Sequence, residues 1–247
     1  MMETQRALVP EDLHPHGLRS KWITGRDILE TLGWRKTLGE AAPWFLARRY
    51  VFYWYDLGNP VPGPPAAVPF QIERASAENL RDFLALRPGY YTRGLLEKRL
   101  ARGHVGILVR SGGRPVLMRW VFLGRVFLPY FDRTLVLQEG DAYTDETFTA
   151  RAFRRRGLFS ASGHPIRLAL RDMGLARVFS SIASWNAAPL KDAPRSGGML
   201  FGECRIARRA GSRSASWIGE IRDRGDGTIA FLGRPDQPGF TATQATR

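Results

Sequence analysis

The spacing of apolar positions divides the chain into a helical start, a short aromatic strand and a longer region of mixed strands and helices. Between 25 and 49 the apolar residues recur at helical spacing, and Thr24 and Pro43 can each begin a short helix. The run YVFYWY at 50–55 is aromatic and β-branched, which predicts a strand. Because apolar runs are mostly core, we expect this strand to be buried; the alternative is a surface for a membrane or a carrier protein.

A proline-rich segment marks the clearest boundary in the sequence. The residues NPVPGPPAAVP at 59–69 exclude a helix or a central strand and predict a stiff linker. We therefore divide the chain into four parts: a helical and aromatic N-terminal extension at 1–58, the linker at 59–69, a main domain at 70–209, and a C-terminal strand with a loose tail at 210–247.

After the linker, the apolar pattern alternates between helix and strand spacing. It predicts two short helices near 76–84 and 92–102, a β-hairpin that turns at 111–113, and further strands. A helix within 157–174, a strand at 175–184, a short helix and two strands that could pair complete the order. This order predicts an α/β fold of layered α+β type, in which helices flank a mixed, mostly antiparallel sheet.

Composition narrows the class of protein. With 247 residues, 44% of them hydrophobic, the chain resembles a globular protein that can bury a substantial core. Its single cysteine, Cys204, excludes an internal disulfide and is expected to pack inside a strand. The N-terminus lacks the apolar stretch of a signal peptide, and no apolar run reaches the ~20 residues of a transmembrane segment. We therefore expect a cytoplasmic protein, with peripheral membrane contact as the only membrane role.

The chain is strongly basic. Lysine and arginine total 37 against 23 acidic residues, which gives a formal charge of +14. Such a surface attracts polyanions, among them a phosphorylated cofactor, an acidic carrier protein, nucleic acid and anionic lipid. The four histidines, His14, His16, His104 and His164, show no metal-ligand spacing with cysteines or carboxylates, so no metal site is predicted.

The stretch from 141 to 201 carries the chemistry. A strand ends at Thr149, the basic loop RAFRRRG follows, and a helix begins around Leu158. The first turn of a helix presents N–H groups without an intrahelical partner, and with the helix dipole these form an anion site. Gly157 permits a close approach of backbone to ligand, and the arginines add charge. The pattern predicts a polyphosphate site.

This stretch resembles the acetyl-CoA-binding motif of the GNAT superfamily, which reads Gln/Arg-x-x-Gly-x-Gly/Ala between a strand and a helix. The motif here is Arg154-Arg155-Arg156-Gly157-Leu158-Phe159. Because Phe159 replaces the family's small residue, we expect it to reshape the loop or displace the helix. Downstream, Asn186 and Gly197 match the Asn and Gly that follow the family's fifth strand.

The resemblance implies acetyl-CoA or another acyl-CoA as acyl donor and assigns roles to its binding residues. The end of the fourth strand would bond the pantetheine arm, the loop would hold the pyrophosphate, and the Asn would lie near the pantetheine amides. The fifth strand would splay from the fourth and open a slot for the thioester. The donor-binding residues implied are Thr147, Phe148, Thr149, Arg154, Arg155, Arg156, Gly157, Leu158, Phe159, Ser160 and Asn186.

The catalytic acid and base have several candidates. Relatives often use a tyrosine after the fifth strand as the acid, but the matching position here is Ala193. Relatives also use a carboxylate on the fourth strand as the base, which makes Asp145 and Glu146 candidates, with Tyr143 and Ser184 as further ones. Because side chains alternate along a strand, only one of the two carboxylates can face the cleft if the strand is regular.

Together these features predict direct transfer of an acetyl or other acyl group from acyl-CoA to an amine, on a small molecule, an amino sugar or a protein. The segment at 22–56 is expected to pack on the main domain and help form the acceptor site, because it is too apolar to be left in water. One alternative is a transferase that takes a long acyl chain from acyl carrier protein. Another is a nucleic-acid-binding domain without catalysis, which is disfavoured because the arginines are spread along the whole chain.

Overall fold

The computed structural model describes residues 14, 15, 23, 25, 26, 29, 47–209 and 212–232. Its helices are α3 (Leu80–Leu86), α4 (Arg93–Ala101), α5 (Leu158–Arg171) and α6 (Ala187–Arg195), with a 3₁₀ turn η1 (Arg151–Phe153). Its strands are β1 (Ala47–Asp56), β2 (Gln71–Arg74), β3 (Val105–Ser111), β4 (Arg114–Leu123), β5 (Arg125–Leu128), β6 (Arg133–Val136), β7 (Asp141–Thr149), β8 (Arg177–Ala183), β9 (Met199–Arg209), β10 (Ser212–Gly219), β11 (Ile221–Asp223) and β12 (Thr228–Phe231). Most of the helical region predicted between 25 and 49, and the tail from 234, lie outside the described residues.

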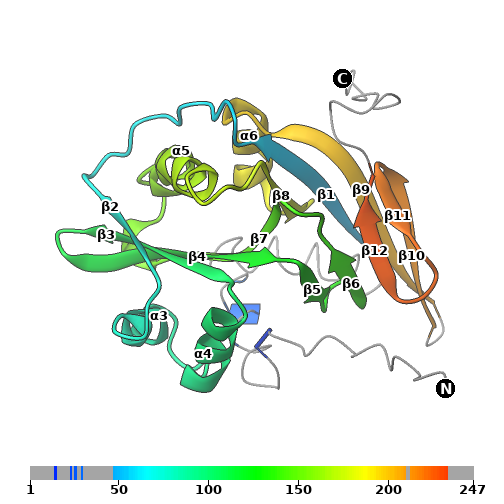
Figure 1. Cartoon of the computed structure of the whole chain (residues 1–247), viewed down its shortest axis with the longest axis horizontal. Coiled ribbons are helices and arrows are strands. Elements are labelled where there is room, and N and C mark those ends of the chain that lie inside the picture. The colour runs from blue at the N-terminus through cyan, green and yellow to red at the C-terminus, as the bar shows by residue number, and fades with distance from the viewer. Residues whose placement is uncertain are drawn as a thin grey trace.

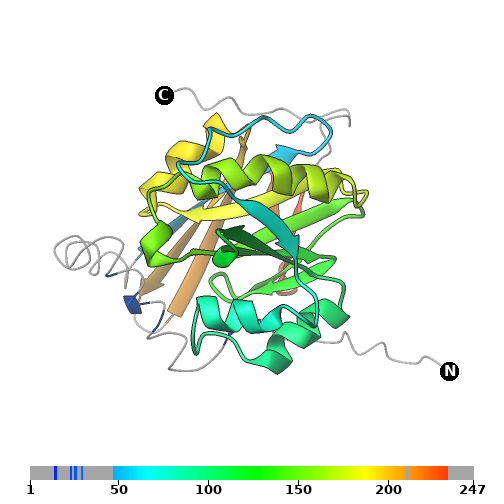
Figure 2. The same cartoon turned by 90° about the vertical axis from the view of Figure 1, so that its left-hand side faces the viewer.

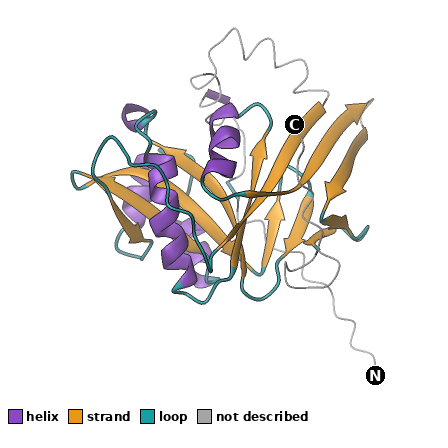
Figure 3. Ribbon diagram, turned by 90° about the horizontal axis from the view of Figure 1, so that it is seen from above, coloured by secondary structure: helices purple, strands orange, loops and turns teal. Residues whose placement is uncertain are grey.

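Eight strands form the main sheet, in the order β10-β9-β1-β8-β7-β4-β3-β2. Each neighbouring pair is antiparallel except β7 and β8, which run parallel. Helices α5 and α6 lie on one face of this sheet, and α3 and α4 on the other (Figure 1). Figure 3 shows α5 and α6 from above, crossing the strands. The predicted fold class, a mixed and mostly antiparallel sheet flanked by helices, is confirmed.

Strand β1 corrects the predicted division of the chain. It lies inside the main sheet, paired antiparallel with β8 on one side and with β9 on the other. The segment 47–56 is therefore a central strand and not part of an extension, because a proline-rich stretch can connect two strands of one sheet as well as two domains. The prediction of a buried strand is confirmed, since Val51, Phe52, Tyr53 and Trp54 are all buried.

The proline-rich segment 59–69, hereafter the strap, runs across α5 (Figure 2). The Ala67 N–H donates to the carbonyl oxygen of Arg156 at 2.9 Å. Gly63 lies so close to the helix that a Cβ there would be 2.4 Å from the carbonyl oxygen of Ser160. Only glycine fits at this contact, and the strap thereby holds the loop in front of α5 in place.

A second, smaller sheet covers part of the main one, with the strand order β11-β12-β6-β5. The sequence predicts β5 and β6, and it includes most of β11 in one longer strand, but it predicts neither β12 nor a separate sheet. Aromatic rings fill the space between the sheets: the ring centroids of Phe179 and Phe231 are 4.4 Å apart, and those of Phe52 and Phe131 are 5.5 Å apart. Burial of such rings is a major stabilising term, because each removes a large apolar area from water.

The expectation for the single cysteine can be compared with the structure. Cys204 is buried within β9, as predicted for a packed thiol. Among the helices that the structure describes, none has the length and apolar character needed to cross a membrane. The described part of the chain also holds no group of three or more His, Cys, Asp or Glu side chains arranged to bind a metal ion.

Candidate active site

Strands β7 and β8 separate halfway along their length. They pair as far as Thr144 and Ser180, and no pair joins these two described strands beyond that point. Strand β7 continues to Thr149 while bonded only to β4. The backbone groups of 145–149 that face β8 therefore have no strand partner there. We call this place the fork; it is the separation of the fourth and fifth strands that the resemblance implies.

A β-bulge lies at the fork. In the pairing of β7 with β4, Glu146 and Thr147 stand opposite the single residue Arg119, and Glu146 has a φ of 52°. The bulge breaks the alternation of side chains, so that both carboxylates reach the same neighbour: His14 Nε2 lies 3.7 Å from Asp145 Oδ2 and 3.7 Å from Glu146 Oε1. The expectation that only one carboxylate faces this side assumed a regular strand, and the bulge corrects it.

Glu146 forms a fully buried ion pair. Arg99 of α4 donates to both of its carboxylate oxygens at 2.8 Å, and the Tyr91 hydroxyl donates to Oε2 at 2.8 Å. Burial alone would raise the pKa of Glu146, but the charge of Arg99, with His14 and the hydrogen bonds, more than offsets burial and lowers this pKa. A carboxylate held in this way is a poor proton acceptor, so Glu146 is placed as a structural anchor of the bulge.

Asp145 has a different environment. Its Oδ1 accepts a hydrogen bond from the Glu146 N–H at 2.7 Å. Its Oδ2 is buried and accepts no hydrogen bond from any described residue. The His14 Nε2 contact at 3.7 Å is too long for a hydrogen bond. Asp145 is thus the carboxylate at the fork with an acceptor atom left for a ligand or a proton.

Tyr143 lies where the two strands begin to separate. Its hydroxyl and the Ser181 hydroxyl of β8 form a hydrogen bond of 2.7 Å across the sheet. Burial, and then the charge of Asp145, raise the pKa of Tyr143 well above its usual value. Tyr143 therefore keeps its proton at neutral pH. The structure brings three of the four predicted catalytic candidates, Tyr143, Asp145 and Glu146, to the fork. The fourth, Ser184, follows the end of β8, and its N–H donates to the Arg49 carbonyl oxygen at 2.9 Å.

The loop before α5 has the backbone of an anion site. Arg155 and Gly157 have positive φ angles of 63° and 73°, and Gly157 is the N-cap of α5. Backbone in this conformation can turn successive N–H groups toward one side. The first N–H to bond back along the helix is that of Ala161, to Gly157 at 2.9 Å. The N–H groups of 158–160 therefore have no helical partner.

The side chains of this loop divide into two sets. Arg155 and Arg156 are exposed, while Arg154 folds back and donates from Nε to the Thr149 carbonyl at 3.2 Å. The strap bonds the carbonyl oxygen of Arg156, which is an acceptor, and so leaves the N–H donors of the first turn unused. The loop combines free donors with positive charge, which suits a phosphate group.

Phe159 does not shift the start of the helix. The helix begins at Leu158, as predicted, and the guanidinium of the buried Arg119 lies 5.0 Å from the Phe159 ring centroid. Because Arg119 belongs to β4, the ring is on the sheet side of α5. The expectation that Phe159 displaces the helix is therefore wrong, since the bulky ring packs inward on a cation.

The residues expected after β8 lie near the other arm of the fork. Asn186 is the N-cap of α6, and its N–H donates to the carbonyl oxygen of Ala183, the last residue of β8. Its role toward a pantetheine arm stays a prediction. Ala193, at the position of the family's tyrosine, is buried and packs with Val51 and Ile182, so no side chain of α6 replaces the missing acid there.

Three tyrosines at this site escaped the sequence analysis. Tyr50 of β1, Tyr90 between α3 and α4, and Tyr130 between β5 and β6 each have their pKa raised by burial, with a further contribution from Asp145. They are far apart in sequence and share no motif. Only for Tyr50 was there a signal, because the segment at 22–56, being too apolar to be left in water, was expected to help form the acceptor site.

A cavity of about 360 Å³ lies elsewhere in the protein. It is lined by the end of β1, the strap, Arg167 of α5 and the residues after α6, including Ser196 and Met199. At the end of β1, Asp56 pairs with Arg177, the first residue of β8, whereas β8 separates from β7 only beyond Ser180. The open strand edge, and the carboxylate oxygen that accepts no hydrogen bond from a described residue, lie at the fork, which makes the fork the candidate active site.

Comparisons with known proteins give structural neighbours only. No protein-family model and no curated protein matches the sequence. Similar solved structures include a GCN5-related N-acetyltransferase from Sphaerobacter thermophilus, 15% identical with a TM-score of 0.48, covering 73% of this chain and 54% of that one. Another is a GCN5-related glucosamine N-acetyltransferase region of a fungal multi-domain β-N-acetylglucosaminidase, 13% identical with a TM-score of 0.49, covering 69% and 22%. A third is an aminoglycoside 6'-N-acetyltransferase from Acinetobacter baumannii, 17% identical with a TM-score of 0.38, covering 52% and 90%.

The chain thus spans about half the length of the first of these neighbours. Because every one of these TM-scores is below 0.5, the functional assignment rests on the geometry of the fork.

Proposed function

We propose that this protein is a GNAT-type N-acyltransferase that moves an acyl group from acyl-CoA to an amine. One observation carries the proposal: a single strand–loop–helix unit holds three features together. They are the open edge of β7, a carboxylate oxygen that accepts no hydrogen bond from a described residue, and the N–H groups at the start of α5 that have no helical partner. These are the parts that acyl transfer needs, namely a place for the donor, a base and an anion site.

The donor fits the residues present at the fork. Acyl-CoA would supply an acyl group activated as a thioester. The N–H groups of 158–160 and the exposed Arg155 and Arg156 would hold its phosphates. The β8-facing backbone of 145–149 would bond its arm and, through an N–H group, stabilise negative charge on the carbonyl oxygen during transfer.

The proton steps would use Asp145 and Tyr143. As the amine nitrogen bonds to the acyl carbon, Asp145 Oδ2 would accept the proton that the nitrogen loses, directly or through water. As the carbon–sulfur bond breaks, the Tyr143 hydroxyl, paired with Ser181, would return a proton to the sulfur. We infer a small-molecule amine or amino sugar as acceptor and action in the cytoplasm.

The first test is thermal stability with and without acetyl-CoA, with ATP at equal phosphate charge as control. A ligand at about 100 times its dissociation constant stabilises a protein by roughly 2.7 kcal/mol. A shift with acetyl-CoA and not with ATP supports the donor site. Equal shifts indicate only a generic anion site, and the absence of any shift contradicts the proposal.

A matched pair of glycine variants locates the donor. Gly157 and Gly174 both have positive φ, 73° and 83°, so alanine costs each about 1 kcal/mol of backbone strain. Only Gly157 belongs to the anion loop. Gly157→Ala should reduce the acetyl-CoA shift and Gly174→Ala should preserve it; equal losses would contradict donor binding at this loop.

A further inference from the structure

The surroundings of Asp145 indicate what its acceptor must look like. The Asp145 side chain is only 16% exposed, and its Oδ2 receives no hydrogen bond from any described residue. A buried carboxylate oxygen in this state is unfavourable, because it has lost water without gaining a donor. A ligand that brings a positively charged donor would remove this deficit.

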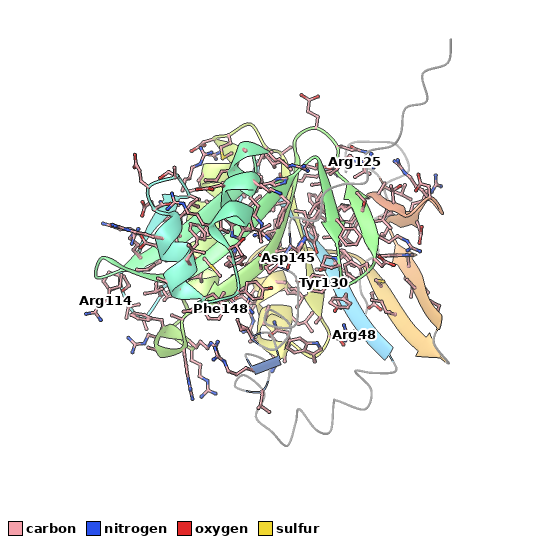
Figure 4. The ribbon with its side chains drawn as sticks, turned by 90° about the horizontal axis from the view of Figure 1, so that it is seen from below. Arg48, Arg114, Arg125, Tyr130, Asp145 and Phe148 are labelled. Carbon is pink, nitrogen blue, oxygen red and sulfur yellow. The ribbon has the colours of Figure 1, made fainter. Side chains whose placement is uncertain are left out.

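Three aromatic rings surround this carboxylate. Tyr50, Tyr90 and Tyr130 come from three separate segments, and each feels the charge of Asp145. The rings of Tyr50 and Tyr130 are 6.1 Å apart and tilted by 34°. All three are half-buried, so each keeps part of its surface open. Figure 4 shows Asp145 and Tyr130 next to each other on the face seen from below.

The inner side of this group is already closed. The His14 ring stacks on Phe122 at 5.3 Å and meets Tyr130 edge-on at 6.5 Å, and His14 is 3% exposed. A ligand must therefore approach Asp145 from the side of the three tyrosines. The faces of aromatic rings attract cations, and a carboxylate adds a full opposite charge.

We propose that Tyr50, Tyr90, Tyr130 and Asp145 form a cage for the ammonium group of the acceptor, and that the acceptor is a monoamine. The cage deepens the proposed function by naming the acceptor class, and it rests on that function for its catalytic meaning.

The restriction to one positive charge comes from two arginines, Arg48 and Arg87, at the edge of the cage. The Arg87 guanidinium carbon lies 3.3 Å from the Tyr90 ring centroid, and Arg48 bonds the Tyr50 hydroxyl. In Figure 4 Arg48 lies beyond Tyr130 as seen from Asp145. A second ammonium on the ligand would meet these two guanidinium groups and be repelled, so a diamine should bind more weakly than a monoamine.

The test measures binding of small probes to the full chain without any acyl donor, by saturation-transfer NMR. Butylamine is compared with butanol, which has the same shape without charge, and with 1,4-diaminobutane. We expect butylamine to bind about tenfold more tightly than butanol, the size of a desolvated cation–π contact with ion pairing. Equal binding of amine and alcohol would overturn the cage, and equal binding of monoamine and diamine would overturn the restriction to one charge.

Variants distinguish the loss of a cage ring from a general disturbance of the fold. Asp145→Asn removes the ion pair but keeps the rings, and should bring amine binding down toward the level of the alcohol. Tyr50→Phe keeps the ring and should bind butylamine as the wild type does, whereas Tyr50→Leu should lose several-fold. Tyr53→Leu, on the opposite face of the same strand, is the control for loss of a tyrosine from β1. Equal losses in the two leucine variants would contradict the cage.

The acetyl-CoA shift on the same protein keeps the two proposals distinguishable. Amine binding without an acetyl-CoA shift would retain the cage and reject the acyltransferase. An acetyl-CoA shift without preference for the amine would reject the cage and leave the acyltransferase standing.

Discussion

The two halves of β7 differ in how many neighbouring strands they bond to: we call 141–144 the closed half and 145–149 the open half. Residues 141–144 are bonded to β8 on one side and, from Ala142 onward, to β4 on the other. Asp141 in this half is closed off as well, because Arg177 donates to both of its carboxylate oxygens at 2.8 Å. Residues 145–149 have β4 alone, a bulge, and a carboxylate oxygen with no described hydrogen bond.

The difference shows how one strand can serve both stability and chemistry. Where the ladder is complete, the backbone groups bond to the neighbouring strands and none of them remains for a ligand. Where it is incomplete, donors and acceptors remain available. Glu146 is an exception, because it lies in the open half but an arginine donates to both of its carboxylate oxygens, as in Asp141.

Removal of β1 should have the largest effect on folding, because β1 joins β8 to β9 in the main sheet. Deletion of 1–58 leaves β8 and β9 without the strand that lies between them. We expect an insoluble or unfolded protein by circular dichroism and size-exclusion chromatography. Deletion of 1–13 keeps both His14 and β1 and should stay folded. A soluble, fully active 59–247 fragment would contradict the central role of β1.

Asp145→Asn should separate activity from stability in the open half. Loss of a general base lowers kcat/KM by about 10²–10⁴-fold. The free energy of unfolding should change by less than about 0.5 kcal/mol, because Oδ2 has no hydrogen bond to lose. Steady-state kinetics and urea denaturation measure the two quantities. Full activity in this variant would remove Asp145 as base.

Glu146→Ala should show the reverse pattern. It removes the carboxylate that pairs with the buried Arg99 guanidinium, which costs about 3–5 kcal/mol of stability. Asp141→Ala in the closed half should cost a similar amount for the same reason. Urea denaturation checks both. If Glu146→Ala were as stable as the wild type but inactive, Glu146 and not Asp145 would be the base.

As the pH falls, stability should be lost first through His104, which bonds to the strand paired with the closed half of β7, and only later through Glu146. Burial, then Arg99 and Arg102, lower the pKa of His104 from 6.5 to about 4, and its Nδ1 accepts the N–H of Leu123. Leu123 pairs with the closed half of β7. A lowered histidine pKa means stability that is present above pH 6.5 and lost as the pH falls toward about 4.

The lowered pKa of Glu146 gives a second loss, which begins only below its usual value of 4.5. His104→Asn preserves an acceptor for Leu123 without the titration. Thermal melts between pH 7 and 4 should then show a smaller decline in this variant than in the wild type. Identical profiles would exclude His104 as the source of the first loss.

Local chemistry made much of this protein readable from its sequence. The hairpin turn follows from Gly112 and Gly113, whose φ angles of 55° and 75° are both positive. The start of α5 follows from Gly157, and the helix near 92–102 from Thr92, whose side chain caps it by accepting the Leu95 N–H at 3.2 Å. In each case the residues that decide the structure are neighbours in the chain.

What the tertiary structure alone decided is non-local. The pattern of β1 predicts a buried strand, but a buried strand looks the same whichever partners it takes, so its place between β8 and β9 is not in the pattern. The bulge at Glu146 falls in a run of polar residues with no glycine to mark it, and it is held by Arg99 from 47 residues away. The sequence by itself determined the glycine-capped loop before α5 and the strand beside it. Which carboxylate stays free, and which aromatic rings surround it, was decided by contacts that form only when distant segments pack.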